Sequence, residues 1–166
     1  AGILVIGDEI LSGRTKDKNI GFIAEYLTNI GIDLKEVRVV ADDEADIVAA
    51  LNALRGRYDY VFTTGGIGPT HDDITADSVA KAFGVPINYH PDVVERFKKR
   101  FGADLNEARL RMARVPDGAA LVESATIMAP GFWLGNVIVM AGVPTIMQAM
   151  MDIVAPKLKS GPRMLS

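Results

Sequence analysis

The sequence predicts an α/β fold with a mostly parallel sheet and helices on both of its faces. Short apolar segments rich in Val and Ile alternate with longer segments whose apolar residues recur at helical spacing. Glycine or proline closes most of these segments. The chain has 166 residues, of which 49% are hydrophobic and 23% charged, and this balance is typical of a globular domain with a buried core. Strands that alternate with helices of this length form βαβ units and hence a parallel sheet.

The first half of the chain gives this alternation most clearly. The pattern predicts strands at 3–6, 33–40 and 60–63, and helices at 19–29 and 45–54. The strand at 3–6 is continuously apolar, as expected for a strand that is buried on both faces. Both helices carry an apolar stripe, and each is followed by glycine, at Gly31 and Gly56.

The second half is less regular. The pattern predicts helices at 72–83, 91–101, 107–113 and 145–158, and strands at 125–128 and 136–140 joined through Pro130-Gly131. The stretch 89–122 fits the alternation least, and we expect it to be an inserted helical segment beside the sheet. We expect one domain over 1–160 with a short tail at 161–166. Because the chain begins inside an apolar strand, it has the character of a piece of a longer protein.

Composition excludes several classes of function. The net charge of −3 offers no broad basic field, so we expect no nucleic-acid partner. Without cysteine there can be no disulfide, thiolate metal site or cysteine nucleophile. No apolar run approaches the length of a signal or membrane-spanning segment, so we expect no membrane partner and a cytoplasmic location.

The unusual residues of the chain gather where predicted strands lead into helices. Four such turns stand out: Gly7-Asp8-Glu9, Asp42-Asp43-Glu44, the stretch 65–73, and Gly142-Val143-Pro144. In a parallel sheet these turns share one edge, at the carboxyl ends of the strands, where open α/β folds bind their ligands. The sequence therefore predicts a ligand site that is built from these turns.

The strongest of the four turns is the glycine loop, which we define as residues 65–70. Gly65, Gly66 and Gly68 allow a ligand to approach bare backbone, and amide groups that precede a helix can hold a phosphate. A tight turn alone would not need three glycines. No Gly-Lys-Ser/Thr follows, and the spacing does not match the dinucleotide fingerprint, so both of those nucleotide-binding motifs are excluded. We expect a phosphorylated small molecule to bind here.

The acidic residues in these turns allow two interpretations. Thr70 and Asp73 could cap the helix predicted at 72–83, and either Asp42 or Asp43 could cap the helix predicted at 45–54. Alternatively, Asp72 and Asp73 could hold a divalent cation such as Mg²⁺ beside the phosphate. Asp8 is harder to explain as a cap because no clear helix follows it directly. The residues alone leave both interpretations open.

Four stretches of the sequence resemble a known family. They are 7–13, which reads Gly-Asp-Glu-Ile-Leu-Ser-Gly, with Asn19 beyond it; 64–75, from Thr-Gly-Gly-Ile-Gly-Pro to Asp-Asp-Ile-Thr; and 129–132 with 140–144. These residues resemble the molybdopterin-binding domain shared by MogA, MoaB and MoeA. The resemblance is closest to the CinA-like branch, the N-terminal domain of competence/damage-inducible protein A, and it covers nearly the whole chain.

The resemblance implies a three-layer α/β/α sandwich, a homo-oligomer and a molybdopterin or nucleotide ligand. Asp42 and Asp73 match the two essential aspartates of MogA-type enzymes, which adenylylate molybdopterin with Mg-ATP. Gly65, Gly66, Gly68 and Thr70 match the phosphate-binding segment, with Asp8 and Gly142 beside it. Asp72 and Ile67 depart from the MogA pattern and match the CinA-like branch, in which this domain is associated with metal-dependent pyrophosphate cleavage of ADP-ribose. A non-catalytic binding domain is the third alternative.

Overall fold

The computed structural model describes residues 1–124, 127 and 129–159. Its main sheet has six strands in the order β2-β1-β3-β8-β7-β6. In chain order the strands are β1 (Gly2–Ile6), β2 (Glu36–Val40), β3 (Val61–Thr64), β6 (Ala120–Val122), β7 (Gly131–Leu134) and β8 (Val137–Met140). The pairs β2–β1, β1–β3 and β3–β8 are parallel, whereas β8–β7 and β7–β6 are antiparallel. The expected mostly parallel sheet is thus confirmed.

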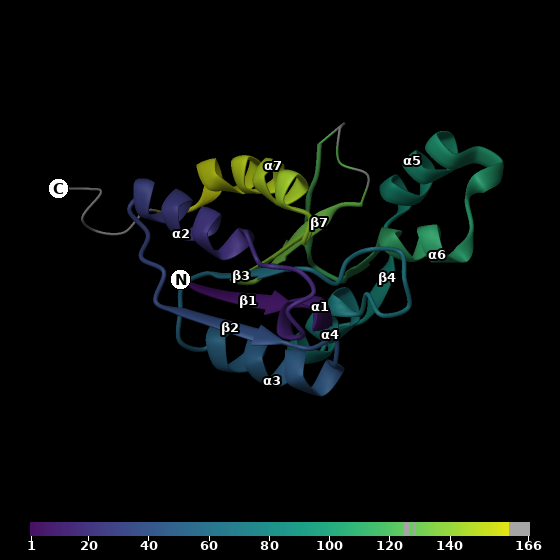
Figure 1. Ribbon diagram of the computed structural model, residues 1–166. Helices are drawn as coiled ribbons and strands as arrows, with labels where there is room; N and C mark the ends of the chain where they lie inside the picture. The colour runs from purple at the N-terminus through teal and green to yellow at the C-terminus, as the bar shows by residue number, and fades with distance from the viewer. Residues whose placement is uncertain (125–126, 128, 160–166) are drawn as a thin grey trace.

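Helices cover both faces of this sheet (Figure 1). The helices α2 (Asn19–Asn29) and α7 (Pro144–Val154) lie on one face, and α3 (Glu44–Arg55) and α4 (Thr75–Phe83) lie on the other. Alternation along β1 creates both interfaces, because Ile3 and Val5 belong to the apolar cluster with α2 and α7 while Leu4 and Ile6 belong to the cluster with α3. All four side chains are at most 3% exposed. The three-layer α/β/α arrangement is therefore confirmed.

The four parallel strands end at the same edge of the sheet. Their register pairs Ile6 with Val40, Val5 with Thr64, and Thr64 with Met140. The segments that follow these strands begin at Gly7, Ala41, Gly65 and Ala141, so the four special turns meet at one edge, as predicted from the sequence.

The region around Pro130-Gly131 differs from the prediction. Gly131 does not join two strands; it begins β7, which pairs with β8. A side chain there would overlap the carbonyl oxygen of Val139, which explains the glycine. The strand expected at 125–128 lies mostly outside the described residues, and Ile127 is in no strand.

The segment between α4 and the main sheet is only partly helical. It contains β4 (Ile87–Tyr89), α5 (Pro91–Phe101), α6 (Glu107–Leu110) and β5 (Arg114–Pro116), and β4 pairs with β5 in a small antiparallel sheet. We call residues 87–116 the insertion. Val93, Phe97 and Ala113 form its own small core. The expected helical insertion is confirmed for α5 and α6, but the two strands were missed, and β6 belongs to the main sheet.

One short helix was missed, and the start of another was predicted wrongly. A one-turn helix, α1 (Asp8–Leu11), follows β1 directly, and α4 begins at Thr75 rather than at residue 72. Short 3-10 turns cover 102–104, 111–113 and 155–157. Within the described part of the chain, no helix combines the length and the apolar character needed to cross a bilayer.

Candidate functional site

The glycine loop has a conformation that only glycine allows at two positions. Gly65 and Gly66 have φ angles of 97° and 75°. A side chain on Gly65 would overlap the carbonyl oxygen of Ile6, and one on Gly66 would overlap the Thr75 hydroxyl. Thr75, at the start of α4, fixes the loop: its Oγ1 donates to the Gly65 carbonyl at 2.9 Å, and its amide donates to the Gly66 carbonyl at 3.0 Å.

Three successive amide groups of this loop are left for a ligand. Within residues 1–124, 127 and 129–159, the amides of Gly66, Ile67 and Gly68 donate no hydrogen bond. The loop therefore has the amide donors that a phosphate needs.

These residues line a cavity of about 580 Å³ at the carboxyl edge of the sheet. Its walls come from the end of β1, the segment 15–19, the glycine loop with Asp73, and the segment 141–146. Much of the wall is apolar, with contributions from Val5, Ile10, Ile67, Val143 and Ile146. A cavity of this size with an apolar wall and a few polar groups is typical of a small-molecule site.

Two buried oxygens of the cavity lining have no hydrogen-bond partner in the described chain. Asn19 and Thr64 are 4% and 1% exposed, and the unpartnered atoms are Asn19 Oδ1 and Thr64 Oγ1. Asn19 Nδ2 donates to the Gly142 carbonyl at 2.9 Å, which fixes the side chain against the last of the four turns. Asn19 is among the residues that carry the family resemblance, but its contact with the Gly142 turn was not predicted, since an Asn at a helix start is common.

Asp8 and Asp42 are joined across the neighbouring strands β1 and β2. The Asp42 amide donates to Asp8 Oδ1 at 3.0 Å, and the Asp8 amide donates to Asp42 Oδ2 at 3.3 Å. Burial raises the pKa of Asp42 above its ordinary value, and the charges of Asp8, Glu9 and Asp73 raise it further, against the lowering effect of the Asp8 amide. Asp8 and Asp42 are thus in contact, but neither belongs to the cavity lining, which contains Glu9 and Asp73 instead. Glu9 lies in one of the four turns but was not predicted as a site residue.

Asp73 also lines the cavity, but it does not act in a helix cap with Thr70. Its Oδ2 accepts from the Thr70 amide at 2.9 Å and from the Thr70 hydroxyl at 2.8 Å, in a turn that precedes α4. Thr70 itself is exposed and lies outside the cavity lining. Of the other pair, Asp43 is the cap of α3, accepting from the Asp46 amide at 3.0 Å, which leaves Asp42 free of that role.

Asp72 is the one expected metal ligand that the structure does not bring to the cavity. Its side chain is 74% exposed and lies 3.6 Å from His71 Nε2. Among the residues described, no group of three His, Asp or Glu side chains is arranged to hold a metal ion. Mg²⁺ commonly binds through one or two carboxylates together with the phosphate oxygens of a ligand. Asp73, which lines the cavity, and Asp42, which contacts Asp8, are the carboxylates expected to act in this mode, and the cation stays a prediction.

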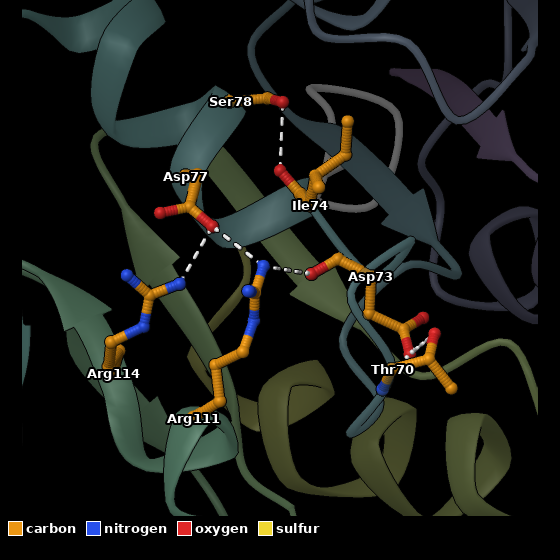
Figure 2. A network of polar contacts seen from close by, with 7 residues as sticks. All are labelled: Thr70, Asp73, Ile74, Asp77, Ser78, Arg111 and Arg114. Carbon is orange, nitrogen blue, oxygen red and sulfur yellow. Dashed lines mark hydrogen bonds and ion pairs between the residues drawn. The ribbon is translucent and has the colours of Figure 1, made fainter. Parts of the chain in front are cut away.

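Two arginines on the far side of the glycine loop were not predicted. Arg111 and Arg114, from the insertion, both approach the carboxylate of Asp77 in α4 (Figure 2). The patterns of the sequence gave no signal for them, because 38 to 41 residues separate Asp73 from the two arginines.

Together these features define an α/β domain with a candidate ligand site at the carboxyl edge of a mostly parallel sheet. The family described as "Probable molybdopterin binding domain" matches residues 2–160. The chain belongs to this family.

Two relatives and two solved structures support this membership. A protein of Aeropyrum pernix is 38% identical to this chain, and the match covers 92% of this chain and 59% of that protein. A CinA-like protein of an Anaeromyxobacter species is 36% identical, and the match covers 90% of this chain and 38% of that protein. The chain therefore spans less than two thirds of these curated relatives. The crystal structure of the protein CinA from Thermoplasma acidophilum, with unknown function, has a TM-score of 0.88 at 35% identity over 94% and 95% of the chains. The molybdopterin biosynthesis enzyme MoaB from Thermus thermophilus has a TM-score of 0.62 at 19% identity over 95% and 89%, which shows the shared fold.

Proposed function

We propose that this domain binds a phosphorylated nucleotide or pterin, with the phosphate on the glycine loop and the ring against the apolar wall. The proposal depends on three amide groups, at Gly66, Ile67 and Gly68, that donate no hydrogen bond within the described chain. All three residues line a cavity of about 580 Å³. Successive amides that face an open space bind anions through charge-assisted hydrogen bonds. The family description and the MoaB neighbour support a pterin ligand, and the cavity wall suits either ring.

Two polar residues of the cavity lining would orient the ring. Asn19 Oδ1 and Thr64 Oγ1 are both buried oxygens without a hydrogen-bond partner in the described chain. A ring that offers an N–H or amino group to either oxygen would satisfy it, after a small movement of the surrounding side chains. Both adenine and pterin rings carry such donors.

Calorimetric titration with ADP-ribose, ATP and a pterin phosphate tests binding directly. We expect one of these ligands to bind and Gly68→Ala to weaken it at least about tenfold, because the added methyl would press on the Asp73 carboxylate and obstruct the loop. Gly21→Ala, in open space on α2, is the matched control and should leave binding unchanged. Absence of binding to all three ligands at millimolar concentration would contradict the proposal.

We further propose that the site hydrolyses a diphosphate bond, such as that of ADP-ribose, with a divalent cation held by Asp42 and Asp73. The carboxylates of Asp8, Glu9, Asp42 and Asp73 are close enough that their charges raise the pKa of Asp42, and a cation would offset this repulsion. When bound, the cation would polarise the phosphate and activate water. The protein's own contribution is to place the phosphate on the loop beside these carboxylates.

The test is hydrolysis of ADP-ribose and FAD with Mg²⁺, Mn²⁺ or Co²⁺. We expect Asp73→Asn to lower the rate at least about a hundredfold. The control is Asp59→Asn, at an exposed residue two positions before β3, which should not change the rate. Turnover that survives Asp73→Asn would exclude the proposed role of this residue. Formation of an adenylylated pterin from ATP and molybdopterin would instead favour the MogA-type activity, and tight binding without any turnover would favour a binding domain.

A further inference from the structure

Arg111 lies close to the glycine loop, outside the lining of the main cavity. It begins the 3-10 turn 111–113 of the insertion. Its Nη2 lies 3.5 Å from the carbonyl oxygen of Asp73 and 3.6 Å from Asp77 Oδ2. Figure 2 shows the guanidinium between these two oxygens, with Arg114 on the other side of Asp77.

Arg111 has N–H donors that the acceptors of this cluster do not use. Arg114 makes the short contact with Asp77, at 2.8 Å, and the contact of Arg111 with the same oxygen is longer. The nearby Asp73 carboxylate is directed to Thr70, at 2.8 and 2.9 Å. One carboxylate is thus shared by two guanidiniums, each of which carries five N–H donors. Arg114 Nε is also buried without a hydrogen-bond partner in the described chain, so the donors exceed the acceptors.

A second hollow connects these arginines to the phosphate-binding loop. It is lined by Gly66, Ile67 and Gly68, which also line the main cavity, and by two arginines and two aspartates: Arg111, Arg114, Asp73 and Asp77. Its volume is about 20 Å³, too small for a ring and enough for about one water-sized atom, such as an oxygen of an anion. The glycine loop therefore borders both the large, mostly apolar cavity and a small hollow that contains the two guanidiniums.

We propose that Arg111 binds a second anionic group of the ligand whose first phosphate rests on the amides of the glycine loop. Asp77 and Arg114 are positioning residues, which hold the Arg111 guanidinium against the loop. A guanidinium suits this role because its planar set of donors matches two oxygens of a phosphate. This inference rests on the proposed binding of a phosphorylated ligand. It adds that the insertion contributes to the site and that ligands with two adjacent phosphates are preferred.

The test compares inorganic phosphate with pyrophosphate by calorimetry, using the whole chain. We expect wild type to prefer pyrophosphate and Arg111→Ala to weaken pyrophosphate binding at least about tenfold, with less than about a twofold change for phosphate. Arg111→Lys keeps the charge but not the planar donor set, so its affinity for pyrophosphate should lie between those of wild type and Arg111→Ala. Arg109→Ala is the matched control, since Arg109 is on the same segment but donates to the Asp104 carbonyl and stacks on Phe101.

The outcomes separate this inference from the proposed function. Equal losses for phosphate and pyrophosphate, or no loss for either, would overturn the role of Arg111 while phosphate binding by the loop stands. Absence of any anion or nucleotide binding in wild type would overturn both. Thermal unfolding of each variant shows whether it is folded, and a merely structural role for Arg111 would lower the midpoint without changing the ratio of the two affinities.

Discussion

The two sides of the glycine loop are built in different ways. On the acidic side, Asp8 and Asp42 directly follow parallel strands, so the topology of the sheet places them on one rim. On the basic side, Arg111 and Arg114 come from the insertion and reach the loop only because this segment packs on α4. The comparison shows that a parallel sheet gathers some site residues by its topology alone, whereas others depend on how an additional segment docks.

This difference has consequences for stability. The acidic rim is part of the main sheet, where β1 and β3 lie between large apolar clusters. The insertion has a small core of its own and is tied to the remainder of the chain by β5 against α4, by the Asp77 cluster and by the ion pair of Arg96 with Glu123 at 2.6 Å. Substitutions on the two sides should therefore differ in magnitude.

The largest effect is expected for Gly65→Ala, at the junction of the two sides. The new side chain would overlap the Ile6 carbonyl, and alanine is strained at a φ of 97°. We expect a loss of more than about 3 kcal/mol in the free energy of unfolding, measured by urea denaturation. Gly21→Ala should instead stabilise the domain by up to about 1 kcal/mol, since alanine favours a helix. A loss of less than about 1 kcal/mol for Gly65→Ala would contradict the loop conformation.

An intermediate effect is expected for Asp77→Asn on the basic side. The change leaves the guanidiniums of Arg111 and Arg114, which are 32% and 21% exposed, without their shared carboxylate. Since solvent partly screens these charges, we expect a loss of about 1–2 kcal/mol by thermal or urea unfolding. The control is Glu44→Gln, which breaks the more exposed ion pair with Lys81 and should cost less than about 0.5 kcal/mol. Equal losses for the two variants would show that the arginine cluster does not hold the insertion.

The smallest effect is expected for Asp42→Asn on the acidic rim, and it depends on pH. Because the pKa of Asp42 is raised in the folded protein, the native state binds this proton more tightly than the unfolded state does. Stability is therefore lost as pH rises from the ordinary pKa of an aspartate through the raised value, and it stays lower at neutral pH. We expect Asp42→Asn to be slightly more stable than wild type at neutral pH, by well under about 1 kcal/mol, because the carboxyl is partly exposed and solvent screens its charge.

Unfolding measured across acid and neutral pH checks this prediction. The advantage of Asp42→Asn should disappear below the ordinary aspartate pKa, where both side chains are uncharged. Asp43→Asn is the matched neighbour and should behave like wild type, because asparagine caps a helix as well as aspartate does. An advantage that persists unchanged in acid would mean that charge is not its cause.

Much of the acidic side could be predicted from sequence because its signals are local. The site residues lie in turns that follow apolar strands: the glycines at 65, 66 and 68 and the aspartates at 8, 42 and 73. The carboxyl ends of parallel strands lie at one edge of the sheet, so these turns come together there. The choice between Asp42 and Asp43 could not be made, since either can cap a helix; the structure assigns the cap to Asp43. The start of α4 was also misplaced, because Thr70 and Asp73 form a turn that has the spacing of a capping box.

By itself, the sequence determined the layered α/β fold, the edge of the sheet at which the special turns meet and the glycine loop that we propose as the phosphate site. Periodicity and turn residues encode these features within short stretches of chain. The tertiary structure alone decided that β7 and β6 run antiparallel, that Asn19 contacts the Gly142 turn and that Arg111 lies beside the glycine loop. Such contacts join residues far apart in the chain, and they form only when packing brings separate elements together.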